Sequence, residues 1–346
     1  MQVTSFHIHE RPPRDLGVLT LTFKRYQPTG SLQTGKQQVA LVFTHCVGTH
    51  KETWEPVIQH LFALQTNTSA PAQIAEVWSM DSPNHGEGGV VNQQPLLKRT
   101  QGITGFDWAR GVDVLYRSGL IGPKKVIGIG HSAGACIMIL VASLYSLMEI
   151  PYCSLILVEP PMVTREFLDN MLVNPGILDQ IVQGVKVKRD NWPSREDAYA
   201  WFRKRFPWKV WHKDAFDLFI NYGLQDLPTA SYPDKTEGVT LSCTREQEAA
   251  GYIYHDDGLE SLEILKRLCH VIPIHVTFGT RIDLVAAETQ DAIVDPKQGR
   301  IMKSVVKIEG AGHQLPQEKP FEVAKFIWDS IINDLNSTAP KLKSNL

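Results

Sequence analysis

The sequence predicts an α/β fold with a mostly parallel sheet of about eight strands, helices on both faces and an inserted helical cap. Short apolar runs, typical of strands buried on both faces, alternate with helical patterns through most of the chain. This alternation stops between residues 162 and 256, where the pattern is helical and rich in aromatic residues. We therefore expect a core made of residues 1–161 and 257–346, and a cap made of residues 162–256.

Composition narrows the class of protein. The chain has 346 residues, of which 43% are hydrophobic and 21% charged, as in soluble globular proteins. A net charge of −2 gives no reason to expect a nucleic acid or an anionic membrane as partner. Five cysteines without paired spacing indicate reduced thiols in an intracellular compartment. No apolar run approaches the ~20 residues of a membrane span, and the N-terminus lacks the apolar core of a signal peptide.

The first part of the chain predicts a hairpin followed by alternating strands and helices. Residues 3–9 and 17–26 alternate with period two, as in a half-exposed antiparallel pair. His7 and His9 share one face of it, where solvent exposure is a simpler reading than a metal site because no third ligand is near. Further along we expect strands at 39–44 and 74–80, helices from about 52 and at 105–118, and a polar loop at 88–104.

The remaining core elements continue the same pattern. We expect strands at 125–130, 155–158, 272–278 and 305–308, and helices at 135–147 and 320–335. Ligands of open parallel sheets bind at the carboxyl ends of the strands. All the candidate chemical residues described below follow such strand ends.

The most informative motif is G-x-S-x-G at Gly130-His131-Ser132-Ala133-Gly134, between a predicted strand and a predicted buried helix. This context is that of a nucleophile elbow, in which a serine occupies a sharp, strained turn. Small residues two positions away on each side let the strand and the helix approach each other. Ser132 is therefore the candidate nucleophile.

A serine nucleophile needs a base and a carboxylate that orients the base. His313 follows the last strand within Gly310-Ala311-Gly312-His313, a loop flexible enough to bring the imidazole to the elbow. Glu159 and Asp283 both end strands and are the two candidate acids. Asp283 could instead cap a helix that begins near Leu284. Glu159 precedes two prolines that fix the chain direction, and a partly buried carboxylate there must find a partner.

The oxyanion hole is expected to use the backbone N–H of Ala133 and that of Val47 or Cys46, which follow the strand at 39–44. Cys46 is a poor candidate nucleophile because no base is adjacent to it. Asp81 to His85 could bind a metal, but such residues more often shape a loop. We expect no metal and no cofactor.

Basic residues in the cap permit two readings. Lys186, Lys188, Arg189 and Arg203-Lys204-Arg205 are interleaved with aromatic residues. They could bind the phosphates of an acyl carrier such as CoA, although a solvated helix face is the simpler interpretation.

With these motifs, the chain resembles the α/β-hydrolase superfamily. Within it, the chain is similar to the fungal peroxisomal branch, which includes a yeast peroxisomal lipase, toxin-biosynthesis hydrolases and the acyl-CoA hydrolase of mycophenolic acid biosynthesis. The similar stretches are residues 41–48 with Trp54, 81–86, 130–134, 155–160 and 312–313. In that branch the acid stands at the strand end occupied here by Glu159, which favours Glu159 over Asp283. The chain departs from the family pattern at Cys46, where glycine is usual.

The resemblance implies a serine hydrolase that cleaves an acyl ester or thioester through an acyl-enzyme, with a large apolar acyl substrate or a CoA thioester. Acyl transfer or cyclisation by the same triad is the main alternative. A binding protein on an inactive hydrolase fold is a third reading, disfavoured by the intact serine and histidine. Ser344-Asn345-Leu346 is one substitution from the peroxisomal address S-K-L. It predicts recognition by the peroxisomal import receptor and residence in the peroxisome, with the cytoplasm as the alternative.

Overall fold

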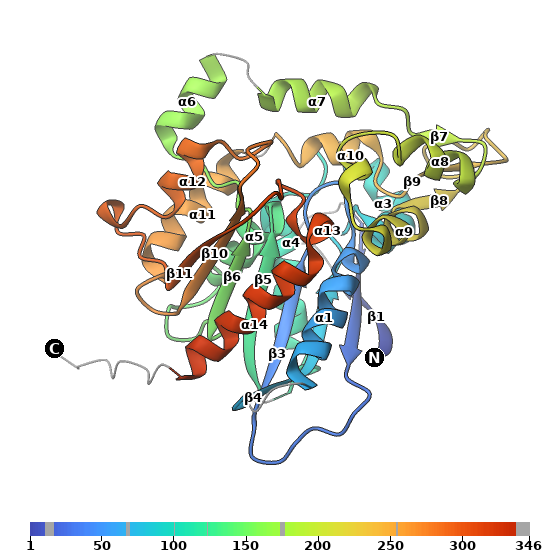
Figure 1. Ribbon diagram of the computed structural model, residues 1–346. Coiled ribbons are helices and arrows are strands. Elements are labelled where there is room, and N and C mark those ends of the chain that lie inside the picture. The colour runs from blue at the N-terminus through green and yellow to red at the C-terminus, as the bar shows by residue number, and fades with distance from the viewer. Residues whose placement is uncertain are drawn as a thin grey trace.

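The computed structural model (Figure 1) describes residues 1–10, 17–66, 70–99, 101–122, 124–173, 177–253 and 255–336. Its centre is an eight-stranded sheet in the order β1-β2-β4-β3-β5-β6-β10-β11. These strands are β1 (Gln2–Glu10), β2 (Leu19–Gln27), β3 (Gln37–Thr44), β4 (Ala72–Met80), β5 (Lys125–His131), β6 (Ser154–Val158), β10 (Ile274–Gly279) and β11 (Ser304–Ile308). β1 pairs antiparallel with β2, and β2 with β4, whereas the other neighbours run parallel. The predicted sheet and its N-terminal hairpin are confirmed.

Helices cover both faces of this sheet. Leu155 and Leu157 of β6 pack in one apolar cluster with α4 (Gly105–Arg117), α5 (Ala133–Ala142) and α11 (His255–Leu268). Ile156 and Val158, which alternate with them, pack in a second cluster with α1 (Glu55–Thr66) and α14 (Pro320–Asn336). Successive side chains of a strand point to opposite faces, so β6 is buried on both sides. This arrangement explains the continuous apolar runs in the sequence.

Local signals explain where α4 begins and which face it buries. The hydroxyl of Thr104 accepts the N–H of Asp107, and the Asp107 carboxylate accepts the N–H of Thr104, forming a capping box. Trp108, Val112 and Leu115 then recur at helical spacing and are buried. The predicted helix at 105–118 is confirmed.

Two expectations for the core are wrong. Residues 88–104 are not all loop, because α2 (Gly86–Val91) and α3 (Gln93–Leu97) lie there. The Asn92 side chain joins this segment to β2, accepting the N–H of Thr20 at 2.8 Å and donating to its carbonyl at 2.9 Å. The helix expected to reach residue 147 ends at Ala142, where the Ser143 hydroxyl donates to the Leu140 carbonyl at 2.6 Å.

The segment between the two halves of the core is mainly helical, but it also contains a small sheet. Its helices are α6 (Arg165–Val173), α7 (Ile177–Val187), α8 (Arg195–Phe202), η2 (Trp208–Val210), α9 (Lys213–Tyr222) and α10 (Arg245–Ala250). Its strands, β7 (Asn191–Trp192), β8 (Leu224–Asp226) and β9 (Val239–Leu241), form a sheet in the order β7-β9-β8. Strands of two or three residues are too short to show a period of two, so the sequence did not predict them. The aromatic residues of this segment pack on one another, Phe202 and Phe219 among them.

The remaining short elements connect the core. They are η1 (Lys51–Trp54), α12 (Ala287–Ile293), η3 (Pro296–Gln298) and α13 (Leu315–Glu318). Figure 1 shows α6, α7 and α10 above one end of the sheet, while α1 and α14 run along its near face. Within the described ranges, no helix has both the length and the apolar character that crossing a bilayer requires.

Candidate active site

Ser132 occupies a sharp turn between β5 and α5. Its backbone has φ 54° and ψ −123°, a region that residues with a side chain rarely adopt. A Cβ on Gly130 would lie 2.4 Å from the Gly134 carbonyl oxygen, and a Cβ on Gly134 would lie 2.5 Å from the His45 carbonyl oxygen. Both glycines are therefore needed for steric reasons, because the strand, the helix and the loop after β3 meet at this turn.

Ser132, His313 and Glu159 form a continuous chain of polar contacts. The Oγ of Ser132 lies 2.8 Å from Nε2 of His313, and Nδ1 of His313 lies 3.1 Å from Oε2 of Glu159. All three residues are buried, with exposed fractions of 6%, 4% and 2%. A carboxylate can only accept, so Nδ1 carries the proton and Nε2 is free to accept from the serine hydroxyl. The structure thus brings together three of the four residues that sequence reasoning offered as nucleophile, base and acid.

The Glu159 side chain is fixed from two sides. Its Oε1 accepts the backbone N–H of Gly279 at 2.6 Å, which leaves Oε2 for His313. Its backbone φ is 50°. Among the described residues, Ser132 and Glu159 are the only non-glycine residues with positive φ. Strain of this kind concentrates at functional sites, because packing must compensate for it.

Asp283 contacts the backbone of His313 and not its imidazole. Its Oδ1 accepts the His313 N–H at 2.7 Å, and its Oδ2 accepts from Arg281 Nη2 at 3.2 Å. The next helix, α12, begins only at Ala287 and has Ala286 at its N-cap position. The alternative in which Asp283 caps a helix near Leu284 is therefore wrong. Asp283 instead holds the loop that carries His313.

His131 supports the same loop, a role that the sequence did not suggest. Its Nε2 lies 2.8 Å from the His313 carbonyl oxygen and donates to it. Burial and the neighbouring His313 lower the pKa of His131 well below its ordinary value, so the ring is neutral. His131 occupies the first variable position of the G-x-S-x-G motif. Because any residue can stand at that position, the motif does not predict this contact.

The candidate oxyanion donors lie on two sides of the elbow. Within the described part of the chain, no hydrogen bond uses the backbone N–H of Cys46, Val47 or Ala133. Ala133 is the first residue of α5, where the helix dipole favours negative charge. The Cys46 side chain is buried and its Sγ lies 3.3 Å from the Thr49 hydroxyl. Burial raises the pKa of Cys46 to about 12, so its thiol is protonated at pH 7.

Two buried histidines shape the loop that holds Cys46 and Val47. His45 donates from Nδ1 to the Cys46 carbonyl at 2.8 Å, and its Nε2 accepts the Ser82 N–H at 2.9 Å. His85 accepts the Gly48 N–H at 3.0 Å through Nε2. Burial lowers the pKa of His45 to about 4 and that of His85 well below its ordinary value. Both rings are therefore neutral at pH 7, as an accepting ring nitrogen requires.

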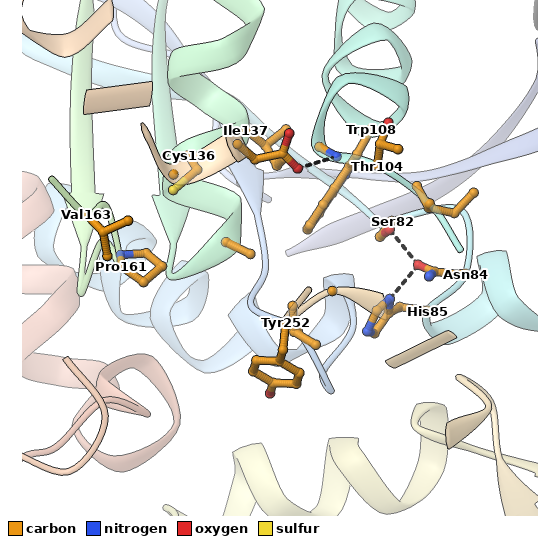
Figure 2. Close-up of a pocket in the computed structure, with 17 residues that line it drawn as sticks. Ser82, Asn84, His85, Thr104, Trp108, Cys136, Ile137, Pro161, Val163 and Tyr252 are labelled. Carbon is orange, nitrogen blue, oxygen red and sulfur yellow. Dashed lines mark hydrogen bonds between the residues drawn. The ribbon is translucent and has the colours of Figure 1, made fainter. Parts of the chain in front are cut away.

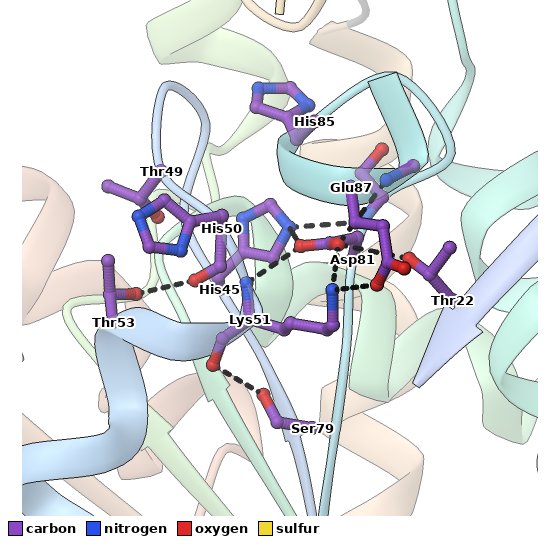
Figure 3. Close-up of polar contacts among 12 residues, drawn as sticks. Thr22, His45, Thr49, His50, Lys51, Thr53, Ser79, Asp81, His85 and Glu87 are labelled. Atoms are coloured by element: carbon purple, nitrogen blue, oxygen red, sulfur yellow. Dashed lines mark hydrogen bonds and ion pairs between the residues drawn. The ribbon is translucent and has the colours of Figure 1, made fainter. Parts of the chain in front are cut away.

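A buried ion network lies beneath this loop (Figure 3). The Lys51 ammonium lies 2.7 Å from Asp81 Oδ2 and 2.8 Å from Glu87 Oε2, and the Lys51 N–H donates to Asp81 Oδ1 at 2.7 Å. Burial alone would lower the pKa of Lys51, but Asp81, Glu52 and Glu87 raise it above its ordinary value. Asp81 therefore neutralises a lysine. This ion pair gives the Asp81 carboxylate a structural role, whereas the sequence had left open that it binds a metal.

The other sequence candidates pack locally. Arg205 lies 4.0 Å from the ring centre of Trp201, and Lys188 pairs with Glu248. His7 and His9 contact different partners, Glu87 and Thr20. The tripeptide at residues 344–346 lies outside the described residues.

Two cavities flank the candidate oxyanion loop, and both are lined by Val47 and Tyr252. The first, of about 140 Å³, lies over the starts of α4 and α5 and is lined by Trp108, Ala133 and Ile137 among others (Figure 2). The second, of about 250 Å³, is lined by residues of α7 and α9 and by Gln314, among others. Ala133 lines only the first of these cavities, and Gln314 lines only the second.

Comparison with known proteins agrees with this geometry. Residues 41–326 match the model of the alpha/beta hydrolase family. The type I acyl-CoA thioesterase mpaH of Penicillium brevicompactum is 25% identical over 239 residues, which are 67% of this chain and 51% of that protein. The abhydrolase domain-containing protein AFT2-1 of Alternaria alternata is 24% identical over 233 residues, covering 61% of this chain and 84% of that protein. The chain spans about half the length of the thioesterases that it matches.

Among solved structures, the peroxisomal alpha-beta-hydrolase Lpx1 of Saccharomyces cerevisiae has a TM-score of 0.78 at 19% identity. The alignment covers 98% of this chain and 91% of that one. At this identity the likeness shows the fold alone. The curated relatives are fungal, as is Lpx1, in agreement with the branch that the sequence resembles. Because the family match spans most of the chain, this protein belongs to the alpha/beta hydrolase family.

Proposed function

We propose that this chain is a serine hydrolase that cleaves acyl esters or thioesters, with Ser132 as nucleophile, His313 as general base and Glu159 as the orienting acid. The observation that carries the proposal is the chain of contacts Ser132–His313–Glu159, with separations of 2.8 and 3.1 Å between buried groups. The two non-glycine residues with positive φ, Ser132 and Glu159, both belong to this series of contacts, and a purely structural role gives no reason for that coincidence.

The mechanism follows from these contacts. Ser132 Oγ attacks the acyl carbonyl carbon while its proton passes to Nε2 of His313, and Glu159 stabilises the imidazolium that forms. The tetrahedral oxyanion accepts from the N–H of Ala133 and from that of Val47 or Cys46. When the C–O or C–S bond breaks, His313 returns the proton to the leaving group. Water, activated by His313, then cleaves the acyl-enzyme and releases the acid.

The names of the curated relatives support thioesters as one substrate class, since three of them are called acyl-CoA thioesterases. The larger of the two cavities can receive the leaving group, because its wall includes Gln314, the neighbour of His313. Lys188 lies in the same wall, where it pairs with Glu248. We therefore include CoA thioesters among the substrates, with the carrier arm in this cavity.

A covalent probe and a substrate panel test the proposal. A fluorophosphonate should label the wild-type protein on Ser132 and leave Ser132→Ala unlabelled. The wild type should also hydrolyse acyl-CoAs, simple esters or both, while Ser132→Ala should not. Absence of labelling together with absence of hydrolysis would indicate a binding protein on a hydrolase fold. Transfer of the acyl group to an added alcohol in preference to water would indicate an acyltransferase or, with an internal nucleophile, a cyclase.

We also propose that the protein acts in the peroxisome, where the structurally similar Lpx1 is named as resident. Where Leu346 is the last residue of the protein, Ser344-Asn345-Leu346 would serve as an import signal. A fluorescent protein fused to the N-terminus should give a punctate distribution that overlaps a peroxisomal marker, and one that masks the C-terminus should stay cytosolic. Equal distributions of the two fusions would contradict the proposal.

A further inference from the structure

The smaller cavity is the space into which an acyl group would extend. Ala133 and Val47, two of the three candidate oxyanion donors, line it. A carbonyl oxygen bound by their N–H groups therefore places the carbonyl carbon at the mouth of this cavity. His313 delivers its proton to the leaving group, and its neighbour Gln314 lines the other cavity. The acyl chain and the leaving group would thus occupy different cavities, both of which are lined by Val47 and Tyr252.

The size of the cavity limits the acyl group. Its volume is about 140 Å³. An apolar cavity of about 150 Å³ in another protein accommodates benzene. Much of the wall here is apolar, including Ile103, Trp108, Ile137 and Val163. A group the size of one aromatic ring or a short chain fits inside, whereas most of a long fatty chain would extend beyond the cavity.

One carboxylate interrupts the apolar wall. Asp257, in the first turn of α11, lines the cavity and accepts the Gly105 N–H through Oδ2 at 2.8 Å. Among the described residues, no hydrogen bond reaches its Oδ1. Burial raises the pKa of Asp257 to about 6, so the carboxylate predominates at pH 7 and above. A partly buried carboxylate oxygen without a protein partner favours a hydrogen-bond donor on the ligand.

Two other features of the wall bear on this point. The indole N–H of Trp108 has no hydrogen-bond partner among the described residues, but its nitrogen is buried with almost no accessible surface, so a ligand does not reach it. Asn84 Oδ1 accepts from Ser82 and from His85, at 2.7 Å in both cases. The open acceptor of Asp257 therefore determines which ligand group this wall favours.

We propose, on the basis of the function proposed above, that the acyl substrates of this enzyme are compact and carry a hydroxyl group at the end remote from the carbonyl. A hydroxyl can donate to Asp257 Oδ1, whereas a methyl group would leave this oxygen unpaired. A phenolic acyl group combines this hydroxyl with the size of one ring.

Matched esters test the proposal directly. We would measure kcat/KM at pH 8 for the p-nitrophenyl esters of 4-hydroxyphenylacetic, phenylacetic and dodecanoic acids. The wild type should favour the hydroxylated ester over phenylacetate about tenfold or more, since a hydrogen bond to a charged group gives discrimination of this order. It should favour both over dodecanoate. In Asp257→Ala the ratio of hydroxylated to plain ester should fall to near one.

The neighbouring Asp256 provides the matched control. It is exposed and does not line the cavity, so Asp256→Ala should keep the wild-type ratio. A ratio near one in the wild type, an unchanged ratio in Asp257→Ala, or a preference for dodecanoate would overturn the proposal. Failure of the underlying function differs from all of these, because no ester would then be cleaved and no fluorophosphonate would label Ser132. Because each result is a ratio within one variant, partial loss of folded protein does not affect it.

Discussion

Replacing Glu159 by glutamine tests which carboxylate orients His313. In the native protein Oε1 of Glu159 accepts the Gly279 N–H at 2.6 Å, while Oε2 lies 3.1 Å from Nδ1 of His313. The glutamine carbonyl must keep the Gly279 contact, because the opposite orientation would place two donors 2.6 Å apart. The NH₂ group then faces Nδ1 of His313.

This orientation forces the wrong imidazole tautomer. Nδ1 must accept from the glutamine amide, so the proton moves to Nε2, which can no longer take the proton of Ser132. The same change of tautomer in a serine protease lowers kcat by about 10⁴, which corresponds to about 5.5 kcal/mol of activation free energy. We expect Glu159→Gln to lower kcat by a factor of this order without unfolding the protein.

Asp283→Asn is the matched control. An asparagine can still accept the His313 N–H through Oδ1, but its NH₂ group then faces Arg281, and the hydrogen bond from that guanidinium is lost. Loss of one hydrogen bond between charged groups costs roughly 1.5 kcal/mol, or about tenfold in rate if all of it reaches the transition state. Both variants should be assayed for kcat on the best ester, with fluorophosphonate labelling and a thermal melt. If Asp283→Asn is crippling and Glu159→Gln is mild, Asp283 is the catalytic acid and our assignment is wrong.

The other predictions concern the nucleophile, the glycines and the buried histidines. Ser132→Ala should lower kcat by about 10⁴-fold or more at an unchanged melting temperature, since triad members act as a unit; substantial residual turnover would contradict the role of Ser132. Gly134→Ala places a Cβ 2.5 Å from the His45 carbonyl oxygen, so chemical denaturation should show a loss of about 1–3 kcal/mol. His45, with a pKa of about 4 when folded, is neutral in the native state and takes up a proton below about pH 6.5 only on unfolding. Its contribution to stability is therefore complete above about pH 6.5 and falls by about 1.4 kcal/mol per unit as the pH drops toward 4, which urea titrations at pH 7 and 5 should show.

The core could be predicted because its signals are local. The buried strands are continuous apolar runs. A helix with one face in solvent has an apolar stripe on its other face, as α4 has in Trp108, Val112 and Leu115. The small sheet β7-β9-β8 could not be predicted, because its strands have only two or three residues. The short helices α2 and α3 depend on contacts made elsewhere, such as that of Asn92 with Thr20. Propensity within the segment does not contain this information.

For the site, the sequence identified residue types at strand ends but not which of them meet. Ser132 and His313 had distinctive surroundings of glycine, whereas Glu159 and Asp283 were equivalent candidates until the resemblance favoured one. The supporting contacts of His131 and Asp257 join elements that are distant in the chain. No pattern in one sequence reports such contacts. They depend on how the strands are ordered and on how the loops cross.

The path of the histidine loop explains why Glu159, at the end of β6, reaches the imidazole. β6 lies between β5, which Ser132 follows, and β10. A Cβ on Gly279, at the end of β10, would lie 2.2 Å from the Ala311 carbonyl oxygen, so the loop crosses directly over this strand end. Asp283, beyond that crossing, meets the loop from its backbone side and accepts the His313 N–H. The imidazole is thereby directed toward β5. The carboxylate that it contacts is that of Glu159, which follows β6, the strand between β10 and β5. The strained φ of Glu159 turns that side chain into the gap, and the Gly279 N–H holds it there.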